Sequence, residues 1–255
     1  MKDPIRWDNL TSKEIGLLAQ ENAIVIIPMG STEQHGPHLP VGTDAILAEW
    51  FSHRTAEALR SQGIPAVITP TFAVANSMHH MSFPGTVSLH PGTFLKELKD
   101  ICSAIAAHGF RRIAIINGHG GNTAPALTGL VDINLELGFP VYFMEYMDGT
   151  DEKPFLESQE CMLHACESET SLMLAYDESL VDPVYKTTKG YPGYTTEAED
   201  RGFLKTFHRQ ETHTENGVMG NSCLATREKG ELLAKAATER LAGTLSDPRI
   251  WGLSV

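Results

Sequence analysis

Residues 23–45 read AIVIIPMGSTEQHGPHLPVGTDA, an apolar run that passes directly into a loop rich in glycine, proline and polar side chains. The run 23–28 is short and mostly β-branched and ends near Pro-Met-Gly, a pattern that predicts a strand buried on both faces of a parallel sheet. The loop that follows it holds two carboxylates and two imidazoles, those of Glu33, His35, His38 and Asp44. The stretch therefore predicts a parallel sheet with a polar site at the end of one strand.

The rest of the chain alternates strands with helices in the same way. Further strands are expected at 66–70, 113–116 and 140–146, and helices at 44–60, from about 94 to 108, and at 123–137, 161–176 and 226–245, with Thr43 or Asp44 as the cap of the first helix. This alternation predicts an α/β fold with a mostly parallel sheet flanked by helices, in which ligands gather at the carboxyl ends of the strands. One domain over residues 1–255 is the expected organisation for this length.

Composition excludes several classes of function. The formal charge of −12 and the absence of any Lys/Arg run argue against nucleic-acid binding. No apolar run approaches the roughly 18 residues of a membrane span, and the N-terminus lacks a secretory apolar region, so a cytoplasmic protein is expected. The four cysteines, Cys102, Cys161, Cys166 and Cys223, lack CxxC spacing and are expected to be reduced, packed thiols.

The loop after the first strand has the residue types of a metal site. Glu33 and His35 are two residues apart, so an extended backbone projects both side chains to the same side. Asp44 can return from the start of the following helix, and a carboxylate can bridge two cations where a neutral imidazole cannot. Oxygen ligands combined with imidazole suit Zn, Mn or Fe. The alternative for this loop alone is a set of capping carboxylates and surface histidines.

Two later segments carry further candidates. His119 lies in NGHGGN (117–122), at the end of the strand 113–116, between glycines that let backbone and substrate approach closely. A phosphate-binding loop is the competing interpretation, but the GxxxxGK[ST] spacing and its lysine are missing. The segment HACESET (164–170) offers His164, Glu167 and Glu169. On one regular helix His164 and Glu169 would point about 140° apart, so they share a pocket only if the helix begins between them. A solvated acidic helix face is the alternative.

Together these segments resemble the creatininase (creatinine amidohydrolase) family. The resemblance rests on five motifs in order, GSTEQHGPHLPVGTDA, FPGTVSLHP, NGHGGN, HACESETSLML and GVMGNSCLATREKGEL. It implies an α/β sandwich, metal-dependent hydrolysis and a homo-oligomer, commonly a hexamer. It also implies two divalent ions per chain, zinc first and manganese or iron as alternatives. Glu33, Asp44 and His119 would hold one ion, while His35 and Asp44 would hold the other.

The same resemblance suggests roles for the remaining candidates. Creatininase carries a Tyr-Glu pair after the histidine of NGHGGN, and its glutamate is a ligand, whereas this chain has Gly120 and Gly121 there. Glu169 is expected to supply the missing ligand, with Glu167 as the alternative. His164 is expected to carry protons, with Glu169 as the second catalytic residue. The expected substrate contacts are Ser77, His79, His80, Gly120 and Gly121.

The predicted reaction is hydrolysis of a C–N amide bond in a small cyclic or formyl amide by water activated at a dinuclear metal centre. Hydrolytic C–C cleavage of an oxidised inositol, of the 3-dehydro-scyllo-inosose type, needs the same activated water and stays open. A non-catalytic metal-binding protein is the alternative from another class. The segment 182–222 is longer than most loops of compact domains, which favours a lid or an oligomer contact.

Overall fold

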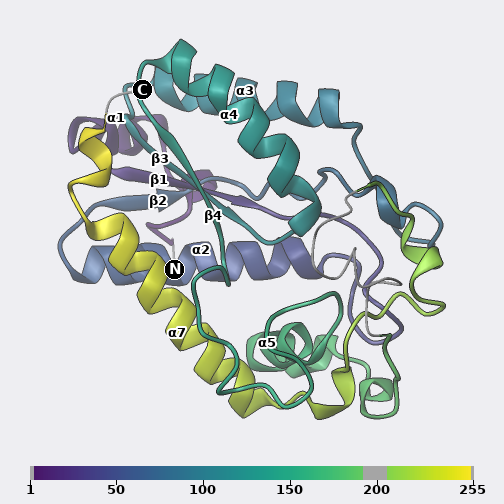
Figure 1. Cartoon of the computed structure of the whole chain (residues 1–255). Helices are drawn as coiled ribbons and strands as arrows, with labels where there is room; N and C mark the ends of the chain where they lie inside the picture. The colour runs from purple at the N-terminus through teal and green to yellow at the C-terminus, as the bar shows by residue number, and fades with distance from the viewer. Residues whose placement is uncertain (1–2, 192–205, 254–255) are drawn as a thin grey trace.

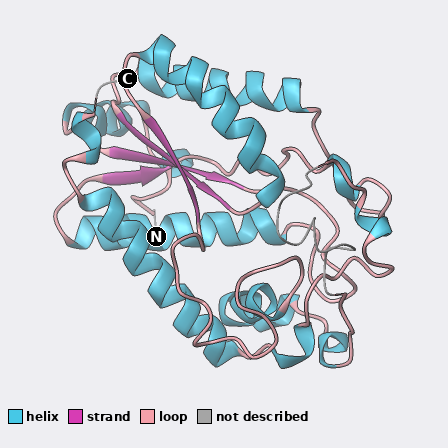
Figure 2. Ribbon diagram, in the orientation of Figure 1, coloured by secondary structure: helices cyan, strands magenta, loops and turns pink. Residues whose placement is uncertain are grey.

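Four parallel strands form the central layer of the protein, and helices cover both faces of the sheet (Figure 1; Figure 2). The strands are β1 (Ile24–Met29), β2 (Ala66–Ile68), β3 (Arg112–Asn117) and β4 (Val141–Glu145), and they lie in the order β2-β1-β3-β4. This computed structural model describes residues 3–191 and 206–253. The predicted α/β class with a parallel sheet is confirmed.

The helices lie in two groups on opposite sides of the sheet (Figure 1). One side carries α3 (Pro91–Ala107) and α4 (Thr123–Leu137), and the other carries α2 (Thr43–Ser61) and α7 (Arg227–Ser246), against which α5 (Glu167–Asp177) packs. The sequence interpretation missed α1 (Ser12–Gln20), which a capping box between Thr11 and Glu14 starts. Short 3-10 helices are η1 (Trp7–Asn9), η2 (Met78–His80), η3 (Gly120–Asn122), η4 (Glu178–Leu180), η5 (Pro183–Lys186), η6 (Gln210–Thr212), η7 (Ser222–Leu224) and η8 (Ile250–Gly252).

Every residue of β1 is buried, because successive side chains enter two different cores. Ile24 and Ile26 pack with α2, α5 and α7, whereas Val25 and Ile27 pack with α3 and α4. This is the period-two alternation of a strand with helices on both faces, and it explains why 23–28 reads as a continuous apolar run.

The start of α2 differs from the prediction in a way that matters for the site. Neither Thr43 nor Asp44 caps the helix: the N-cap is Gly42, which makes no side-chain cap, and Thr43 and Asp44 are already helical. The Thr43 hydroxyl donates to the carbonyl of Pro40 (2.7 Å). The Asp44 carboxylate is therefore not used as a cap and turns toward the ends of the strands.

The helix predicted over 161–176 is shorter, because α5 begins only at Glu167. Ala165 has φ of 52°, in the left-handed region that a right-handed helix cannot include. Its N–H donates to Glu169 Oε2 (2.6 Å), which draws the Glu169 side chain back past the helix start. His164 thus lies outside the helix. Both Glu167 and Glu169 are buried, so the interpretation as a solvated acidic face is wrong.

The prediction of packed thiols is only partly right. All four cysteines are free, and Cys102 and Cys166 are buried, but Cys161 is exposed and Cys223 is half-buried. Burial raises the pKa of both buried thiols to about 12. Among the helices in the described ranges, none has both the length and the apolar character needed to cross a membrane.

The sheet topology brings two loops together at its centre. The connection from β1 leads to β2 on one side, and the next strand, β3, pairs with β1 on the other side. Loops at the carboxyl ends of two such strands enclose the usual ligand crevice of an open parallel sheet. Gly118 N–H donates to the carbonyl of Met29 (2.7 Å), and Asn122 Nδ2 donates to that of Gly30 (2.9 Å). The loops after β1 and β3 are thus joined directly.

Gly30 allows the chain to pass against the first turn of α2. A Cβ added at Gly30 would lie 2.4 Å from the backbone nitrogen of Ala45 and 2.6 Å from the carbonyl carbon of Asp44. Gly30→Ala should therefore destabilise the protein by about 1–3 kcal/mol, measured by urea unfolding. Gly16→Ala, in an exposed position of α1 with no atom within 4 Å, should leave stability unchanged or raise it by up to about 1 kcal/mol. Equal stability of the two variants would contradict this account of Gly30.

Candidate metal centre

The loop after β1 delivers Glu33 and His35 to the end of the sheet, and the first turn of α2 delivers Asp44. Glu33 N–H donates to the carbonyl of Val41 (2.9 Å), so the loop is closed at its base. All three side chains are buried, with relative exposures of 0% for Glu33 and His35 and 2% for Asp44. The three predicted ligands from residues 30–45 thus meet in the interior.

His35 has one nitrogen bonded to the backbone and one facing carboxylates. Its Nδ1–H donates to the carbonyl of Glu33 (3.1 Å), which leaves Nε2 without a hydrogen in the neutral ring. Nε2 lies 3.0 Å from Asp44 Oδ1 and 3.6 Å from Glu169 Oε1. A backbone carbonyl that fixes the tautomer in this way is the usual support of a metal-binding histidine.

His119 repeats the arrangement from the loop after β3. Its Nε2–H donates to the carbonyl of Asn76 (3.0 Å), and its Nδ1 lies 3.0 Å from Asp44 Oδ2 and 3.3 Å from Glu33 Oε1. The two oxygens of Asp44 therefore face different histidines, Oδ1 toward His35 and Oδ2 toward His119. This is the position that a bridging carboxylate would need.

The electrostatics of the cluster favour positive charge. Burial by itself lowers the pKa of His35, but Asp44 and Glu169 outweigh it and raise that pKa well above its usual value. Burial likewise lowers the pKa of His119, and Glu33 and Asp44 reverse the effect. For Asp44, burial raises the pKa, yet the two histidines bring it below its ordinary value. The carboxylates thus attract cations to this point.

Glu169 and Glu167 have separate surroundings. Glu169 groups with His35 and Asp44, whose potential ligand atoms all lie within 4.8 Å of one another. Glu167 faces the other way, where Lys229 Nζ lies 2.6 Å from its Oε1 and the hydroxyl of Ser158 donates to its Oε2 (2.7 Å). Only Glu169 is near the predicted ligands, and Glu167 anchors the loop before α5.

Unpartnered atoms test whether the cluster suits metal ions. Within the described residues, both carboxylate oxygens of Glu33, Nε2 of His35 and Oδ2 of Asp44 are buried and form no well-aligned hydrogen bond. Buried polar atoms of this kind are rare and costly. These atoms converge on one another, and the set of carboxylate oxygens and imidazole nitrogens suits Zn, Mn or Fe. The residues therefore fit the predicted metal centre.

His164 stands beside the cluster. Its Nε2 lies 2.9 Å from both the backbone carbonyl oxygen and the side-chain Nε2 of Gln34, and its Nδ1 lies 3.5 Å from Glu33 Oε1. Burial, followed by the effect of His35, holds the pKa of His164 well below its usual value, so the ring is neutral. Its Nδ1 lies within 4.8 Å of potential ligand atoms of Glu33 and His35.

A cavity of about 440 Å³ opens over the cluster, and Glu33, His119, His164 and Glu169 line it. Four of the predicted substrate contacts, His79, His80, Gly120 and Gly121, also line this cavity. Ser77 does not: it is buried behind His119, with its hydroxyl 3.2 Å from His119 Nε2. His38 also lies off the cavity, where its Nε2 contacts the hydroxyl of Thr170 (2.9 Å).

Several residues of the site were missed from the sequence. Gln34 Nε2 donates to the carbonyl of Gly217 (3.2 Å) and lies 2.8 Å from His80 Nδ1. The position of Gln34 between two predicted ligands was the available signal. Gln210 and Met219 also line the cavity, and Met219 N–H donates to the carbonyl of His164 (2.8 Å). Parts of the segment 182–222 thus reach the site, whereas 192–205 lie outside the described residues, and a lid or an oligomer contact stays a prediction.

Comparison with known sequences supports the resemblance over the whole chain. A family model described as creatininase, creatinine amidohydrolase, matches residues 8–245. Creatinine amidohydrolase from Pseudomonas putida is 29% identical over 93% of this chain and 95% of the relative. Shorter matches include a mycofactocin precursor peptide peptidase from Mycobacterium tuberculosis, 35% identical over 43% of this chain and 45% of the relative. A 3-dehydro-scyllo-inosose hydrolase from Thermotoga maritima is 32% identical over 46% of this chain and 36% of the relative.

Solved structures agree with these sequence matches. A crystal structure of creatinine amidohydrolase (creatininase) has a TM-score of 0.82 and 26% identity, covering 94% of this chain and 96% of the neighbour. A mutant creatininase described as the Zn–Zn type has a TM-score of 0.80 and 27% identity, over 94% and 96% of the two chains. The manganese form of creatininase has the same TM-score and 26% identity, over 94% and 97%. The neighbours thus include zinc and manganese forms.

Asp44 faces both histidines, so its removal should affect both predicted ions. Asp44→Ala should lose both divalent metals, measured by elemental analysis after gel filtration. Asp148→Ala, which changes an exposed carboxylate of the same cavity outside the cluster, should keep the wild-type metal content. Full occupancy in Asp44→Ala would show that this carboxylate does not bridge.

The different surroundings of Glu169 and Glu167 lead to a second test. Glu169→Gln should reduce metal content, because its carboxylate groups with His35 and Asp44. Glu167→Gln should keep its metal but lower the free energy of unfolding, because it loses the charge that pairs with Lys229. Metal analysis and urea unfolding of both variants check this. Preferential metal loss from Glu167→Gln would reverse the assignment.

Proposed function

Because the chain belongs to the creatininase family of amidohydrolases, we propose that it is a metal-dependent hydrolase that cleaves a C–N amide bond in a small molecule. The observation that carries this proposal is the group of buried, unpartnered carboxylate and imidazole atoms of Glu33, His35 and Asp44 at the base of a cavity. Two divalent ions, zinc first, are proposed there. Glu33, Asp44 and His119 would hold one, and His35, Asp44 and Glu169 the other.

When bound, such ions would lower the pKa of a water molecule and polarise the amide carbonyl. The protein's own contribution is to direct Nε2 of His35 and Nδ1 of His119 toward the carboxylates. The carbonyls of Glu33 and Asn76 do this, because each accepts the proton of the opposite ring nitrogen. The cluster is therefore prepared for cations before any substrate arrives.

His164 is the residue proposed to move the proton. The proposal places the hydrogen of the neutral ring on Nε2, toward the carbonyl of Gln34, so that Nδ1 is the basic atom beside Glu33. His164 also lines the cavity. Nδ1 accepts a proton from water as its oxygen attacks the carbonyl carbon. The ring then donates this proton to the amide nitrogen as the C–N bond breaks, which returns His164 to its neutral state.

The cavity wall limits the charge of the substrate. Among the described residues that line it, none is lysine or arginine, whereas Glu145, Asp148 and Glu152 are acidic. A phosphate or carboxylate group would find no cationic side chain there. A small neutral or cationic amide, cyclic or formyl, fits this wall better than a phosphorylated one.

A substrate screen of the zinc-loaded and manganese-loaded protein tests the reaction class. Creatinine, other cyclic amides and formyl amides form one arm, and a 3-dehydro-scyllo-inosose forms the other. Metal-dependent release of an amine, or ring opening of a cyclic amide, supports the proposal. Turnover of the inosose alone would assign C–C cleavage, and metal binding with no turnover in either arm would contradict the proposed chemistry.

His164→Asn should keep its metal content while kcat falls about 10²–10⁴-fold, because the loss removes a proton carrier and not a ligand. Metal analysis and steady-state kinetics on the substrate found in the screen check this. His53→Asn, on the surface of α2 beside Asp3, should keep the wild-type rate. Loss of metal from His164→Asn would make His164 a ligand, and an unchanged rate would remove it from the mechanism.

A further inference from the structure

The ion proposed between Glu33 and His119 has three candidate protein ligands, and one of them, Asp44, is shared with the other ion. Zinc bound by carboxylates and imidazoles generally takes three or four protein ligands. A further side chain near Glu33 and His119 would therefore be a fourth ligand of this ion.

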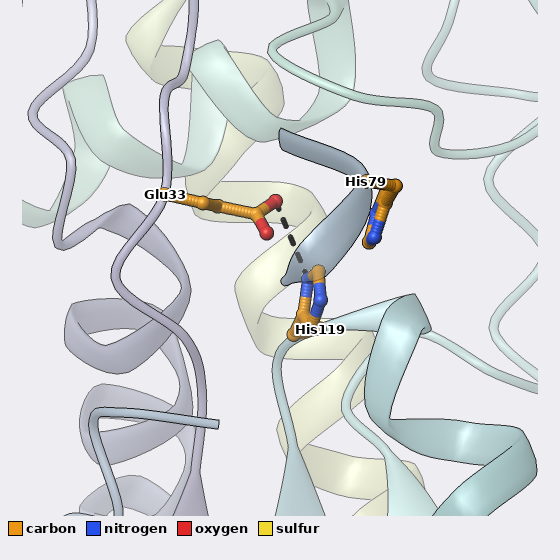
Figure 3. Close-up of side chains that lie close together, drawn as sticks. All are labelled: Glu33, His79 and His119. Atoms are coloured by element: carbon orange, nitrogen blue, oxygen red, sulfur yellow. Dashed lines mark ion pairs between the residues drawn. The ribbon is translucent and has the colours of Figure 1, made fainter. Parts of the chain in front are cut away.

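His79 is such a side chain. It comes from η2, after β2, whereas Glu33 follows β1 and His119 follows β3. One potential ligand atom of each of Glu33, His79 and His119 lies within 4.8 Å of the others. Figure 3 shows the three side chains around one space, with the Glu33 carboxylate on one side and the two imidazoles on the other. Three neighbouring strands thus each deliver one group to the same point.

The ring of His79 stacks on that of His119, with the centroids 5.5 Å apart and an interplanar angle of 14°. Its centroid also lies 4.2 Å from that of His80, whose ring is tilted by 54°. Within the described residues the ring nitrogens of His79 form no hydrogen bond, and both oxygens of Glu33 are buried without a well-aligned one. The nitrogens of His79 are therefore available to a cation.

Gly121 explains how the ring fits. A Cβ added at Gly121 would lie 2.7 Å from Cε1 of His79 and 2.3 Å from Nε2 of His119, whereas a Cβ at Gly120 would meet nothing within 4 Å. Any side chain at position 121 would therefore enter the space that these two rings occupy. The glycine at position 121 thus leaves room for the rings of His79 and His119.

We propose that His79 is a ligand of the ion held by Glu33 and His119. This rests on the proposed metal centre, and it gives His79 a different role from the substrate contact expected from the sequence. Glu169 does not fill this position, because it lies with His35 and Asp44.

The adjacent His80 is the natural comparison. The Gln34 side chain is oriented by Gly36 N–H, which donates to its Oε1 (3.0 Å), so its Nε2 is the donor toward His80 Nδ1 (2.8 Å). The remaining nitrogen of neutral His80, Nε2, therefore carries a hydrogen and faces Glu33 Oε1 at 3.3 Å. His80 therefore presents a hydrogen, and not a lone pair, to Glu33, so we do not assign it as a ligand.

Zinc titration of apoprotein by calorimetry, with elemental analysis, tests the assignment. His79→Ala should lower the zinc affinity of the site formed by Glu33 and His119 at least about 100-fold, because even residues that only support metal ligands contribute 10–100-fold to metal affinity. His79→Glu, which restores a carboxylate, should keep both ions. His53→Asn, which changes a histidine of α2 outside the cavity, is the control and should keep both ions with affinities near wild type. Two zinc ions bound to His79→Ala with wild-type affinity would overturn the assignment.

X-ray absorption of the zinc-loaded wild-type protein gives a result independent of any variant. With His79 as a ligand, His35, His79 and His119 are three imidazoles shared between two ions; without it there are two. A count of two would overturn the inference. Failure of the proposed function has a different signature, because wild-type protein would then bind no transition metal at all.

Discussion

Three carboxylates meet in the interior of this protein with no lysine or arginine paired to them in the described residues. Glu33, Asp44 and Glu169 contact imidazoles, and Glu169 also accepts a backbone N–H. Buried charges without opposite charges are strongly destabilising. The structure therefore needs cations at this point, and the raised pKa of His35 and of His119 expresses the same need in terms of protons. The contacts between the surrounding loops, the orientation of the two histidine rings and the glycines at close approaches all hold these buried carboxylates together.

The parallel sheet brings together the loops that carry these carboxylates and imidazoles. Because β1 and β3 are adjacent and point the same way, their following loops meet without long connections. Gly118, in the loop after β3, also lies against the first turn of α2, where an added Cβ would lie 2.5 Å from the carbonyl oxygen of Asp44. Asp44 is thus wedged between two loops, and its position depends on backbone contacts more than on its own side chain.

The predictable parts of the molecule were those with a strong period or motif. Residues 23–28 identified a doubly buried strand, and the loop motifs identified the cluster. The start of α5 was missed because the left-handed backbone of Ala165 has no signal in its residue type. The sequence does not decide whether Asp44 caps α2 or enters the site, because that depends on the direction in which its side chain points. The contact between Gln34 and His80, which are 46 residues apart in sequence, has no signal in a local motif either.

The bond from Gln34 Nε2 to the carbonyl of Gly217 joins positions 183 residues apart. During synthesis the loop after β1 leaves the ribosome long before its partner exists, by roughly 10–40 s at 5–20 residues per second. The site around Glu33, His35 and Asp44 therefore cannot close during that interval. Any metal ion that this cluster binds would accordingly meet its complete surroundings only after residue 217 has been added to the chain.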